Sequence, residues 1–169
     1  MGDPIKPRKK YKTPKNPWRG DQLSHELYLV GTYGLKNKKE LWKAQTELSR
    51  LRKQARLLLA NISGIKTSQE TNFLKSLSRS KIIDLQSTLD DVLSLTIESL
   101  LERRLQTITW KKGLAHSLYQ ARQMITYRHI LVKNKVVTVP SYLVSGEEEE
   151  TVRIRNDSPL FKAQELKPS

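Results

Sequence analysis

The spacing of apolar residues changes once along this chain, and that change limits the folds available to it. From about residue 41 to residue 125, apolar residues recur mostly at intervals of three and four, which places them on one face of a helix. They then form two short β-branched runs, 130–132 and 136–139, with Lys133-Asn134 between them. Asparagine tolerates the positive φ that tight hairpin turns require. We therefore expect a mainly α chain with a small α+β module, in which two helices precede a β-hairpin.

Two patterns place the first helices. Asp21 is a candidate N-cap for a helix that runs to about Tyr33 and is stopped by Gly34. Asn37, with Glu40 three residues later, resembles a capping box that opens a longer helix. The apolar stripe of that helix consists of Leu41, Ala44, Leu48, Leu51, Ala55, Leu58 and Ile62. Because the stripe lasts only about three heptads, packing inside a helical domain is favoured over a coiled coil.

The later helices are expected from similar signals. Thr67 and Glu70 form a second capping-box pattern, and short helical turns are expected between residues 82 and 95. A helix from near Thr96 to Gly113 and another that starts at Ser117 form a helix-turn-helix-like pair. The inward residues of these helices are Phe73, Leu74, Leu77, Ile97, Leu100, Leu101, Leu105, Ile108, Leu118, Ala121, Met124 and Ile125.

The chain carries a large positive charge. It has 31 Lys and Arg against 17 Asp and Glu, a net charge of +14 and a pI near 10.0. Such an excess destabilises a compact monomer by self-repulsion, which a bound polyanion relieves. Nucleic acid is the first candidate partner and an anionic membrane surface the second. The membrane is disfavoured, because no expected helix pairs a strongly basic face with bulky aromatic residues.

Several classes of functional site find no support in the sequence. The chain has no cysteine, which excludes disulfides, thiolate zinc sites and a thiol nucleophile. Its three histidines lack partners at metal-ligand spacing, and Gly31–Gly34 lacks the ending of a phosphate-binding loop. Asp90-Asp91 is interpreted as a helix start, and Glu147–Glu150 as a solvated acidic loop. We expect no catalytic site, no metal and no cofactor.

Targeting signals are also missing from the sequence. The N-terminal 20 residues contain no apolar stretch, which argues against a secretory signal. No apolar run approaches the ~18 residues that a spanning helix needs. A soluble intracellular protein is the expectation.

Basic residues concentrate over both later helices and the hairpin. An arginine fork holds phosphate oxygens through two hydrogen bonds, and lysine acts as a mobile point charge. The helix start at Ser117 adds free N–H groups and a positive dipole end. Any one surface cation is ordinarily only solvated, but here the whole set shares one sign. The candidate RNA contacts of this region are Arg103, Arg104, Lys111, Lys112, His116, Ser117, Gln120, Arg122, Gln123, Arg128, His129, Lys133 and Lys135.

The first 20 residues form a second basic segment. Four prolines prevent a helix there, and like charges keep the segment extended. It is either a disordered tail or an arm that becomes ordered on RNA, with lysines on phosphates and its aromatic rings, Tyr11 and Trp18, stacked or packed. The candidate contacts of the arm are Arg8, Lys9, Lys10 and Lys12.

The segment "LERRLQTITWKKGLAHSLYQARQMITYRHILVKNKVVTVPSYLV", residues 101–144, resembles the RNA-binding domain of the ribosomal small-subunit protein S-four family, in its archaeal and eukaryotic branch. The resemblance is carried by "LERRLQT", "GLAHSLYQAR", "RHI" and "VPSYLV" in that order. "YKTPKNPW" at 11–18 and "YGLKNKKELWK" at 33–43 are similar to that branch as well. Many bacterial relatives have Gly where Arg128 stands and Asn-Gly at the hairpin turn, so the type of the turn at Lys133-Asn134 is left open.

This resemblance implies four segments: a basic arm (1–20), a helical domain (21–96), the RNA-binding module (97–155) and a C-terminal tail (156–169). It implies a structural, non-enzymatic protein of the small ribosomal subunit in the cytoplasm. Such a protein would bind the 5′ domain of 16S-type rRNA, nucleate assembly and influence decoding accuracy. The implied neighbours are small-subunit protein S-five and messenger RNA near its entry channel, with no membrane.

Two other classes of protein use similar elements. An RNA-modifying enzyme such as a pseudouridine synthase appends this module to a large domain with a catalytic Asp, for which no setting is found here. A DNA-binding helix-turn-helix repressor is the third hypothesis, and a preference for duplex DNA over rRNA would favour it.

Overall fold

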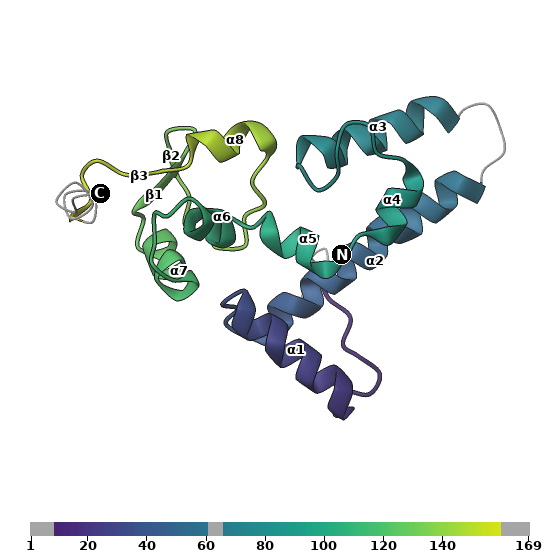
Figure 1. Ribbon diagram of the computed structural model, residues 1–169, viewed down its shortest axis with the longest axis horizontal. Coiled ribbons are helices and arrows are strands. Elements are labelled where there is room, and N and C mark those ends of the chain that lie inside the picture. The colour runs from purple at the N-terminus through teal and green to yellow at the C-terminus, as the bar shows by residue number, and fades with distance from the viewer. Residues whose placement is uncertain (1–8, 61–65, 160–169) are drawn as a thin grey trace, which may run out of the picture.

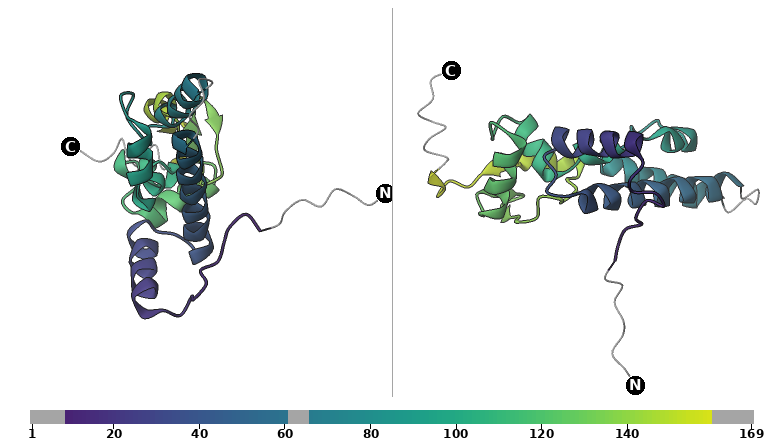
Figure 2. Two further views of the ribbon diagram at one scale, coloured as in Figure 1. Left: turned by 90° about the vertical axis from the view of Figure 1, so that its right-hand side faces the viewer. Right: turned by 90° about the horizontal axis from the view of Figure 1, so that it is seen from below.

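The computed structural model describes residues 9–60 and 66–159, and within them the chain forms eight helices and three short strands. The helical domain contains α1 (Gly20–Thr32), α2 (Lys38–Ala60), α3 (Lys66–Arg79), α4 (Leu89–Ser94) and α5 (Ile97–Glu102). The module contains α6 (Leu105–Lys111), α7 (Leu118–Thr126), β1 (Ile130–Val132), β2 (Lys135–Val136), α8 (Gly146–Thr151) and β3 (Arg153–Ile154). The two parts lie at opposite ends of an elongated molecule, from which α1 projects (Figures 1 and 2). The expected fold class, mainly α with a small α+β module, is confirmed.

Helix α2 is the central helix of the helical domain. It packs against α1, α3, α4 and α5, and its predicted apolar stripe is buried apart from the half-buried Ala44. Phe73 and Leu77 of α3 close the larger core, as expected. Leu41 belongs to a smaller core with Leu29, Leu35 and Leu101. The last expected member of the stripe, Ile62, lies outside the described residues.

The predicted helix starts are only partly correct. Helix α1 has Arg19 as its N-cap, so Asp21 lies in the first turn instead. The Asn37 side chain accepts the N–H of Glu40 at 3.3 Å, which confirms half of that capping box. The other half is missing because the Glu40 carboxylate binds arginines of the module. Thr67 lies inside α3, so the second capping box is wrong.

A single helix from Thr96 to Gly113 is also wrong, because the chain turns out of the helix at Arg104. The Arg104 backbone is extended (φ −73°, ψ 142°) and forms a β-bridge with Leu143. The N–H of Leu105 donates to the Tyr142 carbonyl at 2.8 Å, which fixes the break. Gly113 ends α6 with φ +71°, as expected.

The break also bears on the expected domain boundary at residue 97. Leu100 of α5 packs in the larger core of the helical domain, whereas Leu105 of α6 packs in the module. We therefore propose that the module begins at Arg103.

The module has a three-stranded antiparallel sheet of order β2-β1-β3. The hairpin is confirmed, and both turn residues, Lys133 (φ +47°) and Asn134 (φ +63°), are left-handed as a type I′ turn requires. The second expected run is strand only to Val136, and β3 was not predicted. Leu105, Ala121 and Ile125 are buried in the module core, as expected.

The Glu147–Glu150 run is not a solvated loop. It forms α8, which Ser145 and Glu148 open with a reciprocal capping box. Three of its carboxylates have partners in this chain, and Glu147 pairs with Lys133 at 3.6 Å. Glu149 binds Lys81 at 3.2 Å and Arg103 at 3.1 Å, and Glu148 accepts the Tyr142 hydroxyl at 3.0 Å. The acidic run therefore fastens the module to the loop after α3.

No helix within the described parts of the chain is long and apolar enough to cross a membrane.

Candidate nucleic-acid interface

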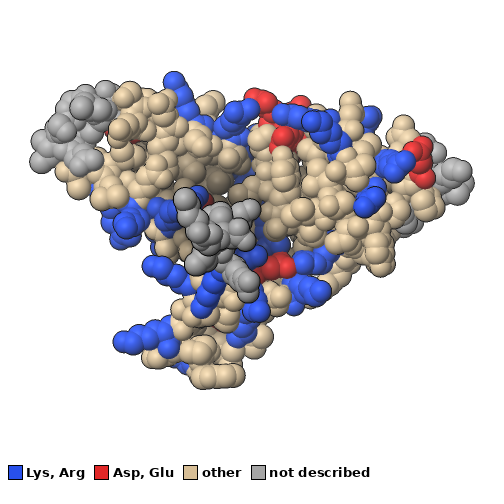
Figure 3. Space-filling model, turned by 180° about the vertical axis from the view of Figure 1, so that it is seen from behind, with Lys and Arg blue, Asp and Glu red and all other residues tan. Residues whose placement is uncertain are grey.

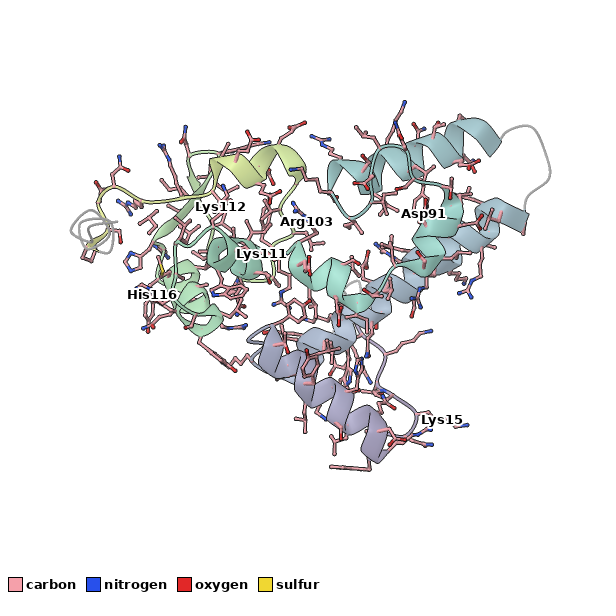
Figure 4. All side chains as sticks on the ribbon, in the orientation of Figure 1. Lys15, Asp91, Arg103, Lys111, Lys112 and His116 are labelled. Atoms are coloured by element: carbon pink, nitrogen blue, oxygen red, sulfur yellow. The ribbon has the colours of Figure 1, made fainter. Side chains whose placement is uncertain are left out.

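Arg103, expected as a phosphate contact, points into the junction between the module and the helical domain (Figure 4). Its Nε donates to the Ser80 carbonyl at 3.0 Å and its Nη2 to the Val144 carbonyl at 3.1 Å. Its third contact is the ion pair with Glu149. With only 12% of its side chain exposed, Arg103 acts in this structure as a structural tie.

Arg104 and Arg122 converge on one carboxylate of α2. Arg104 is 6% exposed, and its Nη2 lies 2.7 Å from Glu40 Oε2. Arg122 Nη2 lies 2.6 Å from Glu40 Oε1, and its Nη1 lies 3.2 Å from Glu40 Oε2. Both guanidinium groups are therefore held by Glu40, across 64 and 82 residues of sequence.

The ionisation of Glu40 follows from these neighbours. Burial alone would raise the pKa of this carboxyl, but hydrogen bonds from Arg122 and then Arg104 outweigh it and hold the pKa below its ordinary value. Glu40 is therefore an anion at neutral pH, and two cations surround it.

Gln106 completes the same junction, and sequence reasoning missed it. Its side chain is 1% exposed, and Nε2 donates to the Gly34 carbonyl at 2.9 Å and to the Leu118 carbonyl at 3.0 Å. Its Oε1 accepts from Arg122 Nη1 at 3.2 Å. Gln106 thereby links the start of α7 to the turn between α1 and α2. Nothing local in the sequence distinguishes it from a surface glutamine.

Other expected cations remain on the surface of the module. Lys112, Arg128 and Lys135 are exposed and have no ion-pair partner within residues 9–60 and 66–159. Lys111 pairs with Glu102 at 3.0 Å, and Lys133 lies 3.6 Å from each of Glu147 and Glu148, but both lysines are also exposed. These five are the lysines and arginines of the predicted module contacts that a ligand can reach directly.

Arg128 occupies a special backbone position. It follows the C-cap of α7 with φ +66°, and the N–H of His129 reaches back to the Met124 carbonyl at 3.0 Å. The Arg128 N–H donates to the Ile125 carbonyl at 3.1 Å, which completes a Schellman motif. Glycine is the usual residue at such a position, so the arginine side chain is kept there at a conformational cost.

The start of α7 is organised as predicted, with Ser117 as its N-cap. The Ser117 hydroxyl accepts the Gln120 N–H at 3.2 Å, and Gln120 Oε1 accepts the His116 N–H at 2.7 Å. The His116 and Gln123 side chains are exposed, and His116 lies at the outer edge of the module (Figure 4).

His129 is half-buried, and its ring contacts the end of the module. Nδ1 lies 3.0 Å from the hydroxyl of Ser158, which is itself buried. The carbonyl of His129 accepts the N–H of Arg155 at 2.8 Å. Its ring and carbonyl thus join α7 to the segment after β3.

The N-terminal arm contacts α2 at Tyr11 and Lys12, and Arg8 is outside the described residues. The Tyr11 ring packs on Trp42 with 5.9 Å between centroids, and Lys9 Nζ lies 5.3 Å from the centre of the Tyr11 ring. The Lys12 N–H donates to the Thr46 hydroxyl at 3.0 Å. The packed alternative for Tyr11 is thus confirmed, whereas Trp18 is 86% exposed.

Two exposed tyrosines, one on α7 and one at its C-cap, were not selected from the sequence. Tyr119 and Tyr127 are 62% and 63% exposed, and Tyr127 is next to Arg128. Exposed aromatic rings among cations suit the stacking of unpaired RNA bases. The helical period was a usable signal, since it places both tyrosines off the face of Ala121 and Ile125.

Figure 3 shows lysine and arginine side chains from α1 to the module, with acidic side chains confined to a few places.

Within residues 9–60 and 66–159, no group of three or more His, Asp or Glu side chains is arranged to hold a metal ion.

Comparisons with known proteins find relatives both of the module and of nearly the whole chain. The S4 domain family matches residues 103–150. A protein of Ignicoccus hospitalis named small ribosomal subunit protein uS4 is 49% identical over 162 residues, which cover 96% of this chain and 98% of that protein. Proteins of the same name from Hyperthermus butylicus and Thermoplasma volcanium are 48% and 47% identical, over 96% and 99% of this chain and 92% and 84% of their own lengths.

Proposed function

Because this chain belongs to the family of small ribosomal subunit protein uS4, we propose that it is a structural, non-enzymatic component of the small ribosomal subunit that binds its rRNA. The observation that carries this proposal is the near full-length similarity to proteins of that name. It is supported by a module on which Lys112, Arg128 and Lys135 are exposed and have no ion-pair partner among the described residues.

Two surfaces are proposed to meet the RNA. The first is the exposed side of the module, with Lys111, Lys112, Arg128, Lys133 and Lys135 on phosphates and the module's two exposed tyrosines on unpaired bases. The second is the arm, where Lys9, Lys10 and Lys12 are exposed beside α2. Recognition is by RNA shape and backbone, since side chains cannot read the deep and narrow major groove of A-form RNA.

Arg103, Arg104 and Arg122 take a different part in this proposal. In the free protein they hold the module against the helical domain through Glu149 and Glu40, and so set the relative orientation of the two surfaces before RNA binds. A fixed orientation favours a junction of RNA helices, because such a ligand must be contacted from several directions at once.

The finer assignments are also proposals, and they rest on the family. We propose binding to the 5′ domain of 16S-type rRNA early in assembly, a position in the cytoplasmic ribosome beside small-subunit protein S-five and near the messenger-RNA entry channel, and an influence on decoding accuracy. The high positive charge supports early binding, because electrostatic steering speeds association with RNA.

The salt dependence of binding to a small-subunit rRNA fragment tests this function. Eight neutralised phosphates give a slope of log affinity against log salt of about −6 to −7. Replacing Lys112 or Lys135 with Ala should reduce the magnitude of the slope by roughly 0.7–0.9 each, without changing the free energy of unfolding. A nearly flat salt dependence, or tighter binding to duplex DNA of equal length, would contradict the proposal.

A further inference from the structure

A groove of about 400 Å³ lies between α2 and the segment that leads into the β-bridge of Leu143. The groove has an apolar floor that includes Leu100, Leu101 and Leu143. Its charged lining consists of Lys10, Lys43, Glu40, Glu47, Arg104 and Arg122. Glu47 is bound to Arg50 at 2.6 Å, so Glu40 is the acid that faces the two module arginines.

One polar atom of a side chain that lines this groove lacks a partner among the described residues. Arg104 is 94% buried, yet its Nε has no hydrogen-bond acceptor among the described residues. Buried donors in folded proteins are nearly always paired, so this guanidinium N–H is available to an acceptor that the described residues do not supply. The donor belongs to a side chain that lines the groove, and two lysines with no ion-pair partner within the described residues line it as well.

Two arginines hold the Glu40 carboxylate through contacts that a phosphate group can also accept. Its two oxygens receive three N–H groups from two arginines at 2.6, 2.7 and 3.2 Å. An arginine fork binds carboxylate and phosphate oxygens in the same planar, two-point manner. A phosphodiester, like a carboxylate, shares one negative charge between two oxygens that can accept these N–H groups.

We propose that one RNA phosphodiester binds Arg104 and Arg122 in the place that the Glu40 carboxylate occupies in the free protein. The groove is then a binding site for the RNA backbone, and Glu40 blocks this site until RNA displaces it. This inference rests on the proposed RNA-binding function and deepens it. The phosphate displaces the carboxylate, gains the unused Nε of Arg104 and approaches Lys10 and Lys43. Glu40, which is 17% exposed in the first turn of α2, turns to solvent.

This exchange replaces one set of charge-assisted hydrogen bonds with another. The groove thus gives Arg104 and Arg122 the RNA-contacting role that their ion pairs with Glu40 otherwise prevent.

Affinity measurements on two acid-to-amide variants test the inference. Glu40→Gln removes the competing anion, and it should lower the Kd for a small-subunit rRNA fragment by about fivefold, the equivalent of one ion pair of about 1 kcal/mol. The same variant should unfold at a lower temperature, because it loses the ion pairs that join α2 to the module. Glu47→Gln removes an equal charge from the same groove but leaves the contacts of Arg104 and Arg122 with Glu40 intact, and it should change the Kd less than twofold. Unchanged or weaker binding by Glu40→Gln, at a temperature where it is folded, overturns the inference.

A tethered probe tests the groove with Glu40 in place. The chain has no cysteine, so Ser141→Cys in the groove lining gives a single attachment point for an iron chelate that cleaves nearby RNA backbone. Cleavage of one short backbone stretch is expected, and Gln86→Cys, in the exposed loop before α4, should not cleave that stretch. RNA that binds normally but is not cut from position 141 overturns the inference alone. Wild-type protein that does not bind the RNA contradicts the proposed function itself.

Discussion

Arg128 combines a stability cost with an expected function. It adopts φ +66° at a position where glycine avoids the strain, and its side chain is exposed without an ion pair among the described residues. Arg128→Gly should therefore raise the free energy of unfolding by about 0.5–1 kcal/mol while weakening RNA binding. Denaturant unfolding and RNA titration measure the two effects separately.

Arg128→Ala is the matched control, because it removes the same charge and keeps the strain. It should weaken RNA binding as Arg128→Gly does, with little change in stability. If Arg128→Gly bound RNA as tightly as the wild type, Arg128 would not be a contact.

Gly34 is needed for two physical reasons. Its φ is +58°, and a Cβ at this position would lie 2.8 Å from Leu118 Cβ and 3.1 Å from Gln106 Nε2. Gly34→Ala should lower the free energy of unfolding by about 2–4 kcal/mol, through left-handed strain and overpacking at the junction. Gly31→Ala is the control, since nothing lies within 4 Å of its Cβ position and it lies inside α1. There alanine should stabilise by about 0.5–1 kcal/mol. Equal effects of the two substitutions would show that Gly34 is not a close-contact position.

At the scale of elements, α8 is expected to act as a clasp between the module and the helical domain. Glu149→Gln removes the carboxylate shared by Arg103 and Lys81, and should lower the free energy of unfolding by about 1–2 kcal/mol. Glu150→Gln, in the same helix but exposed and unpaired among the described residues, should change it by less than about 0.5 kcal/mol. Thermal or urea unfolding of both variants checks this, and a loss of equal size in both would rule out the clasp.

The elements also show what sequence reasoning can reach. The buried faces of α2, α3 and α7 were predicted correctly, because the helical period is local information. The break at Arg104 was not, because it depends on pairing with Leu143, 39 residues later. The Glu run was misread for the same reason, since the partners of Glu149 are Lys81 and Arg103.

At the scale of the whole molecule, acid should weaken the junction between the module and the helical domain. Burial raises the pKa values of Glu40 and Glu149, but their cationic neighbours outweigh it and keep both below the ordinary value of 4.5. A folded pKa below the unfolded one stabilises the protein fully above about pH 4.5, and this contribution is lost as the pH falls through the folded pKa. The free energy of unfolding should therefore decrease as the pH falls below about 4.5. Glu40→Gln and Glu149→Gln should each show a shallower drop, and acid dependence as steep as that of the wild type in both would disprove the assignment.

The candidate site was only partly accessible from the sequence for a similar physical reason. The charge excess and the basic module pointed to RNA, but whether a cation faces solvent or a carboxylate depends on the tertiary structure. Lys112, Arg128 and Lys135 remained exposed, whereas Arg104 and Arg122 meet Glu40 across the junction. Gln106 carries no charge and gave no signal, and Gly34 was expected only as the stop of the first helix, not as a contact in that junction.

Crosslinking of the protein to RNA in cells, followed by sequencing of the attached RNA, tests the central claim most directly, because it identifies the RNA and the binding site together. The proposed function predicts crosslinks concentrated in one small-subunit rRNA, within its 5′ domain. The account would be contradicted by crosslinks spread over unrelated RNAs, or by a site in another class of RNA with small-subunit rRNA unlabelled.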